Sequence, residues 1–259
     1  MIKFFRKIRQ NLLIENKFSK YLLYAIGEII LVVIGILIAL QINNNNDISK
    51  TAEKENRYLT LIRNEMNNNL NSLKEERIKL GVCIVSQRTI LGLMRNEFAL
   101  DTISEKQLSR IIVGAISEQI SMNYENGVLT ELIASANLKD IKNENIRNKL
   151  SSWESKVFKI REKEEQVQVY WIKSNDFIEL NGLLRTVFDQ TAYSDYVELE
   201  QLSTDTSNKN LLNSSQFENI LLIQLASSMH LEKGVYPIYQ TELVELIDLL
   251  DEELKKLNK

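Results

Sequence analysis

One side chain in this sequence stands out for the chemistry it could perform. Glu28 is the only charged residue between Tyr21 and Leu40, a run of twenty residues that contains thirteen Leu, Ile or Val. A carboxyl group in such apolar surroundings can join helices by hydrogen bonding to a neighbouring protein group. It can also relay protons or pair with a cationic residue of a partner helix. Both roles are open from the sequence.

Elsewhere the chain lacks the residue patterns of common enzymes. A single His and a single Cys leave no Cys/His metal cluster, and none of the usual nucleophile, zinc, phosphate-loop or dinucleotide motifs is present. His230 lies among leucines and is expected to be structural or on the surface. Cys83 is expected to be a small core residue, with an intermolecular disulfide as the alternative. We therefore expect a protein that is not an enzyme and binds no cofactor or metal.

The element that must position Glu28 is a membrane-spanning helix. Twenty helical residues extend about 30 Å, the thickness of the hydrocarbon core of a bilayer. Aliphatic residues each favour insertion by about 0.3 to 0.6 kcal/mol, which together outweigh a cost of roughly 3 kcal/mol for one carboxylate. A cleavable signal peptide is the alternative, but the run is long for one and no small-residue cleavage site follows Ala39. We expect an uncleaved signal anchor over residues 21–42.

Small residues share one face of this predicted helix with Glu28. At 100° per residue, Gly35 and Ala39 each lie about 20° from Glu28, on opposite sides of it, and Ala25 lies about 60° away. Small residues let two membrane helices approach closely. The pattern predicts a helix–helix interface here, which would make the protein a homo-oligomer or bind it to another envelope membrane protein.

Basic residues precede the span and predict its orientation. Six of them are found in the first twenty residues, against Glu15 as the single acid: Lys3, Arg6, Lys7, Arg9, Lys17 and Lys20. Because basic flanks are retained in the cytoplasm, residues 1–20 are expected inside and residues 43–259 outside, with the inverse topology as the alternative. The tail could form a short amphipathic helix bound to anionic lipid, or could act only through its charge. The chain has a net charge of −3, so the outer part is acidic, which argues against nucleic acid as a partner.

The residues of the span also carry a resemblance. The stretch KFSKYLLYAIGEIILVVIGILIALQINN, residues 17–44, resembles the signature of a family of single-pass membrane proteins common in Bacteroidota, to which no activity is attached. The basic lead MIKFFRKIRQNLL fits as well. A weaker central motif of that family is similar to Tyr124-x-x-Gly127 and to the residues that follow it: Asn137, Leu138, Asn145 and Leu150. The resemblance implies an inner-membrane protein of a Gram-negative cell.

The chain departs from that family at one place. Family members usually have a Trp after the Ile-Asn-Asn of the span, where this chain has Asn45. The expected aromatic anchor at the outer interface is therefore missing. Asn43 to Asn46 are left to mark the exit from lipid.

Beyond the span the sequence predicts an all-α fold, an elongated antiparallel helical bundle over residues 43–259. One Pro and eight Gly in 259 residues favour long helices. Apolar residues recur at helical spacing from Ile48 to Phe98 and, as a coiled-coil-like seam, from Ile146 to Phe188. Ser104 with Gln107 resembles a capping box that opens a helix to about Ser117.

Other segments have weaker signals. A short helix is predicted from about Gly127 to Ala136 after a loop at residues 121–126, and a polar loop is predicted over residues 195–215. Pro237 should kink or divide the last helix near Val235. Glu164 interrupts the seam of residues 146–188, and with its acidic neighbours it is expected on a solvated face.

These features predict a scaffold or docking subunit anchored in the inner membrane by an associating span. Two alternatives remain open: an accessory subunit of an ion-coupled membrane complex that uses Glu28, and a periplasmic sensor whose bundle reads a ligand. A tail of twenty residues holds no output domain, so a sensor would need a partner to pass on its signal.

Overall fold

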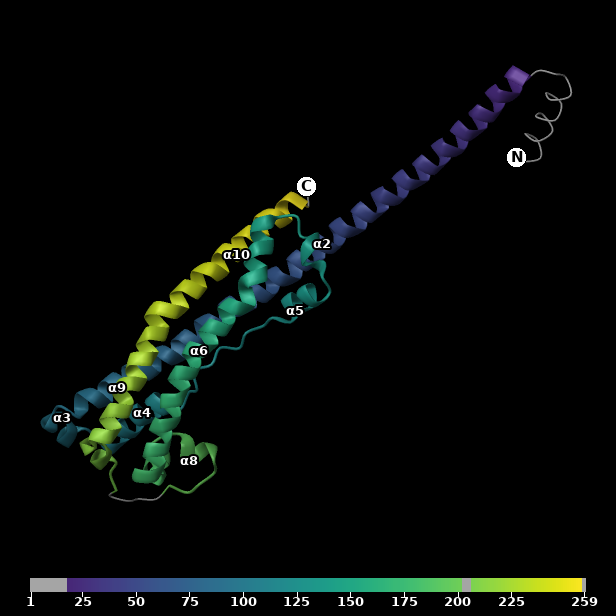
Figure 1. Ribbon diagram of the computed structural model, residues 1–259. Helices are drawn as coiled ribbons and strands as arrows, with labels where there is room; N and C mark the ends of the chain where they lie inside the picture. Colours follow the sequence, from purple (N-terminus) through teal and green to yellow (C-terminus); the bar gives the residue numbers. More distant parts are fainter. Residues whose placement is uncertain (1–17, 202–205, 258–259) are drawn as a thin grey trace. The chain divides into compact units, whose positions relative to one another are not determined.

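The computed structural model describes residues 18–201 and 206–257, and within these ranges every regular element is a helix. The all-α prediction is confirmed. The chain divides into two compact units between Arg57 and Tyr58, called here the N-terminal unit (residues 1–57) and the C-terminal unit (residues 58–259). Figure 1 shows the elements along the chain.

The helices begin and end close to the predicted positions. Their bounds are α2 Phe18–Leu93, α3 Glu97–Thr102, α4 Glu105–Ile116, α5 Gly127–Ala134, η1 Asn137–Asp140, α6 Glu144–Asn181, α7 Leu184–Asp189, α8 Tyr193–Tyr196, η2 Lys209–Asn213, α9 Ser215–His230, the π-helical turn η3 Leu231–Val235 and α10 Tyr236–Leu257. The predicted polar loop at residues 195–215 therefore also contains part of α8 and all of η2.

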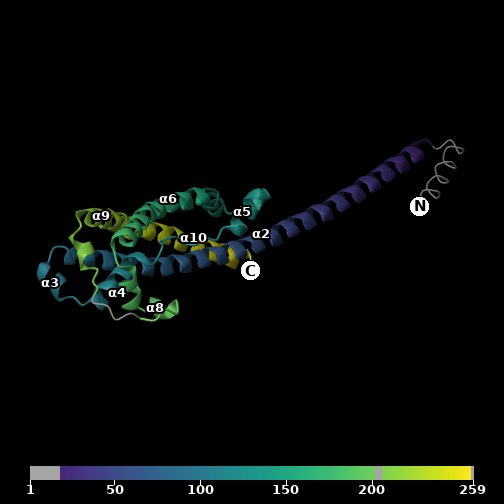
Figure 2. The same cartoon turned by 90° about the horizontal axis from the view of Figure 1, so that it is seen from below.

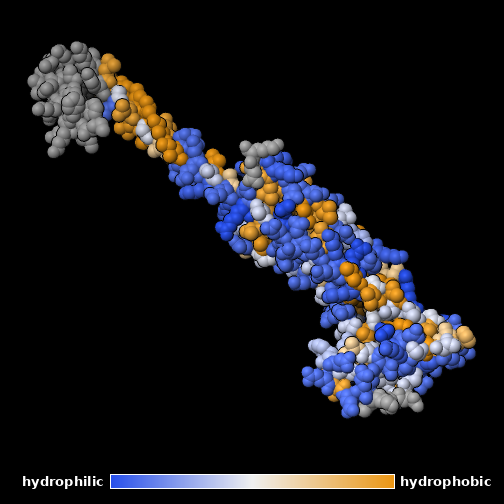
Figure 3. Space-filling view, turned by 180° about the vertical axis from the view of Figure 1, so that it is seen from behind, coloured by the Kyte–Doolittle hydropathy of each residue, from blue (hydrophilic) through white to orange (hydrophobic). Residues whose placement is uncertain are grey.

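The N-terminal unit consists, in its described part, of a continuous stretch of α2. The aliphatic side chains from Leu22 to Ile42 are exposed, and Figure 3 shows them as an orange band. The helix continues through the polar residues that follow, where Gln41 Nε2 donates to Asn45 Oδ1 at 3.2 Å and Asn43 Nδ2 donates to Asp47 Oδ2 at 3.2 Å. One helix in the described chain is thus long and apolar enough to cross a membrane.

The C-terminal unit is built from four limbs that alternate in direction (Figures 1 and 2). Residues 58–93 of α2 form the first limb, α3 to α5 the second, α6 the third, and α9 with η3 and α10 the fourth. Ion pairs fix this order: Arg95, after the end of α2, contacts Glu218 at the start of α9, and Lys149, near the start of α6, contacts Glu245 in α10. The first and third limbs therefore run in one direction, and the fourth runs back along both.

The predicted apolar seams form the core of this unit. In α2 the buried residues of the predicted seam are Leu59, Ile62, Met66, Leu73, Leu80 and Ile84. In α6 the predicted seam is buried except for Val157 and Trp171, which are half-buried. In α10, Leu243, Ile247 and Leu250 are buried, and Leu254 and Leu257 pack against them. Helical spacing alone thus placed most of the core correctly.

Local chemistry explains where the helices begin and end. Ser104 and Gln107 form the predicted capping box, with Gln107 N donating to Ser104 Oγ and Ser104 N donating to Gln107 Oε1, each at 3.3 Å. The third limb ends at Asn181, earlier than predicted, because the chain leaves the helix at Gly182. A Cβ at position 182 would lie 2.6 Å from the carbonyl oxygen of Ile178, so the close approach there requires glycine.

Pro237 divides the fourth limb as predicted. Proline lacks an amide hydrogen, and its ring collides with the carbonyl four residues earlier in a regular helix. The π-helical turn at Leu231–Val235 widens the backbone just before the proline, and Tyr236 N donates to Leu231 O across five residues. The chain thus passes the proline without losing its helical course.

Candidate functional site

The predicted membrane interface lies on one uninterrupted helix. Because α2 is continuous through residues 25–39, Glu28, Gly35 and Ala39 share one face, and Ala25 lies at its edge. Gly35 and Ala39 are exposed, and no atom outside the helix lies within 4 Å of where a Cβ on Gly35 would be. A second helix therefore has room to approach this face closely.

The basic residues proposed to orient the chain fall largely outside the described residues. These are Lys3, Arg6, Lys7, Arg9 and Lys17. Lys20 belongs to α2, but its side chain is not described. The lipid-binding tail therefore stays a prediction.

In the C-terminal unit, polar side chains gather where the second limb is not helical. Residues 117–126 are not helical, so their amide groups lack the bonds that a helix supplies. Side chains of α2 supply them: Glu76 Oε1 accepts from Ser121 N at 2.6 Å, and Asn69 bonds both N and O of Glu125 at 2.8 Å. This stretch, called here the strap (residues 117–126), is thereby bonded to α2 at Ser121 and at Glu125.

Glu65 completes this fastening at the start of α5. Its carboxylate accepts from Val128 N at 2.7 Å and from Leu129 N at 3.3 Å, the position of a helix N-terminal cap. Glu65 is only 5% exposed, and burial is the main reason that its pKa is raised, against the two backbone bonds that lower it. A cap normally provided by the preceding residue comes here from another helix.

A second carboxylate lies deeper, between three limbs. Glu164 of α6 is 4% exposed, and its Oε1 accepts from the Tyr124 hydroxyl of the strap at 2.7 Å and from the Tyr236 hydroxyl of α10 at 2.8 Å. Burial raises the pKa of Glu164, and its hydrogen bonds from the two tyrosines and from Met122 N lower it less. Burial also raises the pKa of both hydroxyls, so they remain neutral donors.

Aromatic rings surround this hydrogen-bonded group. The ring of Tyr239 lies 5.9 Å from that of Tyr124 and 5.7 Å from that of Trp153, and the Arg161 guanidinium lies 5.1 Å from the Tyr124 ring centre. Glu164 is almost fully buried, so hydrogen bonds from neighbouring residues replace those that water would make to its carboxylate.

The solvated face expected for Glu164 is therefore wrong. The residue occupies the seam position that the apolar spacing assigns to the core, and the core supplies two hydroxyl donors for it. A polar residue in phase with an apolar seam is the signal for such a site, and Ser174 follows the same rule, since its Oγ donates to Gln224 Oε1 at 2.6 Å. In α2, polar residues in phase with the apolar seam are found in the same way at Glu65, Asn69 and Glu76.

The motif residues singled out by the family resemblance gather around the same limb. Tyr124 binds Glu164, and Gly127 begins the helix that Glu65 caps. Asn137 Nδ2 donates to the Tyr58 hydroxyl at 3.4 Å, and Leu150 is buried in the core. These residues hold the second limb against α2 and α6.

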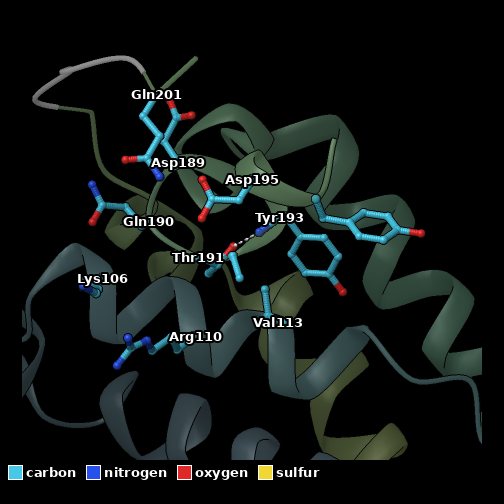
Figure 4. A pocket seen from close by; sticks show the side chains of 11 residues that line it. Lys106, Arg110, Val113, Asp189, Gln190, Thr191, Tyr193, Asp195 and Gln201 are labelled. Carbon is cyan, nitrogen blue, oxygen red and sulfur yellow. Dashed lines mark hydrogen bonds between the residues drawn. The ribbon is translucent and has the colours of Figure 1, made fainter. Parts of the chain in front are cut away.

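A groove lies at the other end of the second limb, between α4 and the α7–α8 segment (Figure 4). Its volume is about 820 Å³, within the range of small-molecule sites. Lys106 and Arg110 of α4 line one side, and Asp195 and Tyr193 line the other. Sequence patterns do not predict this groove, because its two sides come from segments about eighty residues apart.

The two residues considered for redox or metal chemistry have ordinary surroundings. Cys83 is buried, its Sγ donates to Ala115 O at 3.3 Å, and burial raises the pKa of the thiol to about 12, so it is a core residue. His230 is exposed. Within residues 18–201 and 206–257, no group of three or more His, Cys, Asp or Glu side chains could hold a metal ion.

Comparisons with known proteins add no identity to this description. No family model, no curated protein and no solved structure matches the chain.

Proposed function

We propose that this chain is a non-enzymatic, single-pass inner-membrane protein that acts as a docking or scaffold subunit. The span anchors the protein in the membrane. Through the face that carries Glu28, Gly35 and Ala39, it associates with a second membrane helix. That helix belongs either to another copy of this chain or to another envelope protein. The observation that carries the proposal is that Glu28, the one carboxylate of the apolar stretch, shares a face of the continuous helix α2 with the small residues Gly35 and Ala39. The basic N-terminal residues support a cytoplasmic N-terminus and a periplasmic bundle.

The chemistry of the span supports association over a lone anchor. A carboxyl group facing acyl chains costs several kcal/mol, and a partner helix relieves that cost by accepting or donating a hydrogen bond. Gly35 and Ala39 allow the backbones to come close enough for that bond. The C-terminal unit adds a packed helical body whose non-helical strap is bonded to α2 at Ser121 and Glu125 and to α6 at Tyr124.

Two glycines of the same span provide a matched test. Gly35→Ile fills the proposed interface, whereas Gly27→Ile places the same side chain about 100° from Glu28, and both glycines have open space around them. The mass of the full-length protein in gentle detergent, measured by light scattering together with identification of copurifying proteins, reports association. Loss of the partner in Gly35→Ile alone supports the proposal. Equal behaviour of the two variants contradicts it.

The variant Glu28→Gln distinguishes the ion-coupled alternative from the docking proposal, because glutamine keeps hydrogen bonding but carries no acidic proton. The docking proposal expects both assembly and phenotype to be retained in this variant. Retained assembly with a lost phenotype would favour the ion-coupled role instead.

A further inference from the structure

The groove between α4 and α7–α8 is held open by hydrogen bonds outside its lining. Glu105 at the start of α4 accepts from Ser207 Oγ at 2.6 Å and from Asn208 N at 3.0 Å. Asn208, 2% exposed, accepts from Leu183 N at 2.7 Å and donates to Leu183 O at 3.2 Å. These bonds join the start of α4 to the start of α7, so the two sides of the groove keep their spacing without a ligand.

The far side of the groove is also fixed internally. The rings of Phe188 and Tyr193 lie 5.3 Å apart, and Thr191 Oγ1 donates to Val187 O at 2.7 Å. Arg185 pairs with Asp189 at 3.1 Å, which neutralises that carboxylate of the lining. A short segment with these contacts presents its remaining side chains in defined positions.

Three charged groups of the lining have no such contacts. Within residues 18–201 and 206–257, the side chains of Lys106, Arg110 and Asp195 make no ion pair or hydrogen bond. Lys106 and Arg110 are four residues apart on one helix face, where like charges destabilise a helix by a few tenths of a kcal/mol. An anionic group bound between them would remove this repulsion. Asp195, across the groove, offers the opposite charge (Figure 4).

This distribution of charge selects among ligands. A simple anion such as phosphate would gain from Lys106 and Arg110 but be repelled by Asp195. A ligand with a carboxylate at one end and an ammonium at the other satisfies both sides, and arginine binds carboxylates in a bidentate manner. The volume of about 820 Å³ exceeds the needs of a single amino acid, and Tyr193 and Tyr196 add aromatic surface for side chains.

We propose that this groove binds a short zwitterionic peptide, with the peptide carboxylate on Lys106 and Arg110 and the peptide ammonium on Asp195. Such a site gives the bundle a ligand-reading role in addition to docking. It involves only residues of the C-terminal unit, so it does not depend on whether the membrane helices associate.

The test uses full-length protein in detergent and tri-alanine as the probe, with N-acetylated and C-amidated tri-alanine as capped forms. Ligand-observed NMR titration is expected to show one saturable site for the free peptide and at least tenfold weaker binding of either capped form. In Asp195→Asn the free and N-acetylated peptides should bind equally, and in the double variant Lys106→Gln/Arg110→Gln the free and C-amidated peptides should bind equally. Lys159→Gln, an exposed lysine of α6 outside the lining, should bind as the unaltered protein does.

Three outcomes would overturn the proposal. One is the absence of saturable binding at millimolar peptide in protein whose melting temperature is unchanged. Another is equal binding of free and capped peptides by the unaltered protein. The third is displacement of the peptide by inorganic phosphate at equal concentration with no effect of Asp195→Asn, which would identify an anion site instead.

Discussion

Tyr124 and Glu164, 40 residues apart in the sequence, meet in the core with the tyrosine hydroxyl 2.7 Å from the carboxylate. Their side chains belong to limbs of different kinds, a non-helical strap and a long helix. The same carboxylate oxygen also accepts the Tyr236 hydroxyl of α10. One buried acid therefore joins three limbs of the bundle, and removing it should affect all three.

Glu164→Ala leaves two buried hydroxyls without their acceptor. Hydrogen bonds to charged groups contribute about 1.5 to 3 kcal/mol each, and their loss leaves an unsatisfied polar group. We expect the free energy of unfolding to fall by about 3 kcal/mol, measured by urea denaturation of the protein in detergent with the fluorescence of Trp153 and Trp171 as the signal. Glu165→Ala, at an exposed neighbour, should change it by less than about 0.5 kcal/mol. A similar small change for Glu164→Ala would show that the network contributes little.

Glu164→Gln tests the raised pKa through the pH dependence of stability. Since the folded-state pKa lies above the ordinary value of 4.5, the folded protein binds the proton more tightly than the unfolded chain. The contribution of Glu164 is therefore complete below pH 4.5 and declines as the pH rises toward the folded-state pKa. Glutamine stays neutral and can still accept a hydrogen bond, so its contribution to the stability does not decline with pH.

The stability of the Gln variant relative to the unaltered protein should thus be constant below about pH 4.5 and increase above it. Glu65, whose pKa is raised in the same direction, is present in both proteins, so its contribution to the pH dependence largely cancels. Urea midpoints measured from acid to neutral pH provide the comparison. A relative stability that is flat or that declines with pH would rule out a raised pKa for Glu164.

Glu65→Ala removes the cap of α5 that is supplied from α2. Loss of a helix N-cap costs about 0.5 to 2 kcal/mol, so the first amides of α5 should open more often. Hydrogen exchange followed by mass spectrometry should show faster exchange at Val128 and Leu129 with the centre of α6 unaltered. Glu75→Ala, an exposed residue of α2, should leave both regions unchanged, and identical exchange in the two variants would contradict the capping role.

Cys83 offers a simple check of the packing between α2 and α4. Burial raises the pKa of its thiol to about 12, and the side chain is 2% exposed, so the thiolate needed for reaction is absent near neutral pH. The folded protein is expected not to react with Ellman's reagent at pH 8 and to release one equivalent after denaturation. Rapid reaction of the folded protein, or a disulfide-linked dimer on a non-reducing gel, would favour the intermolecular alternative.

The sequence predicted the helices well because their cores follow one period. Leu59, Ile62 and Met66 repeat at helical spacing and are buried, and Ser104 with Gln107 starts a helix where the capping box indicates. Pro237 divides the last limb for a reason that requires no tertiary information. Local sequence rules are enough to predict a segment whose backbone amide and carbonyl groups are hydrogen-bonded within its own helix.

The strap and the groove could not be predicted in this way. The bonds of Asn69 and Glu76 join residues 45 to 56 positions apart. The phase of these two residues within the apolar seam of α2 indicates burial, but it does not indicate which segment of the chain they bind. Glu164 was assigned to solvent because acidic runs are normally solvated, although its phase within the apolar seam indicated otherwise. The groove depends on where α7 and α8 fold back against α4. The spacing of apolar residues carries no information about that position.

The central claim is that the Glu28 face of the span contacts another protein, and a photocrosslinking amino acid incorporated in the native membrane tests it most directly. Val32 lies about 40° from Glu28 and Leu37 about 180° from it, and both side chains are exposed on α2. The account predicts a protein adduct from position 32 and only lipid adducts from position 37. Protein adducts from neither position, or equally from both, would contradict it.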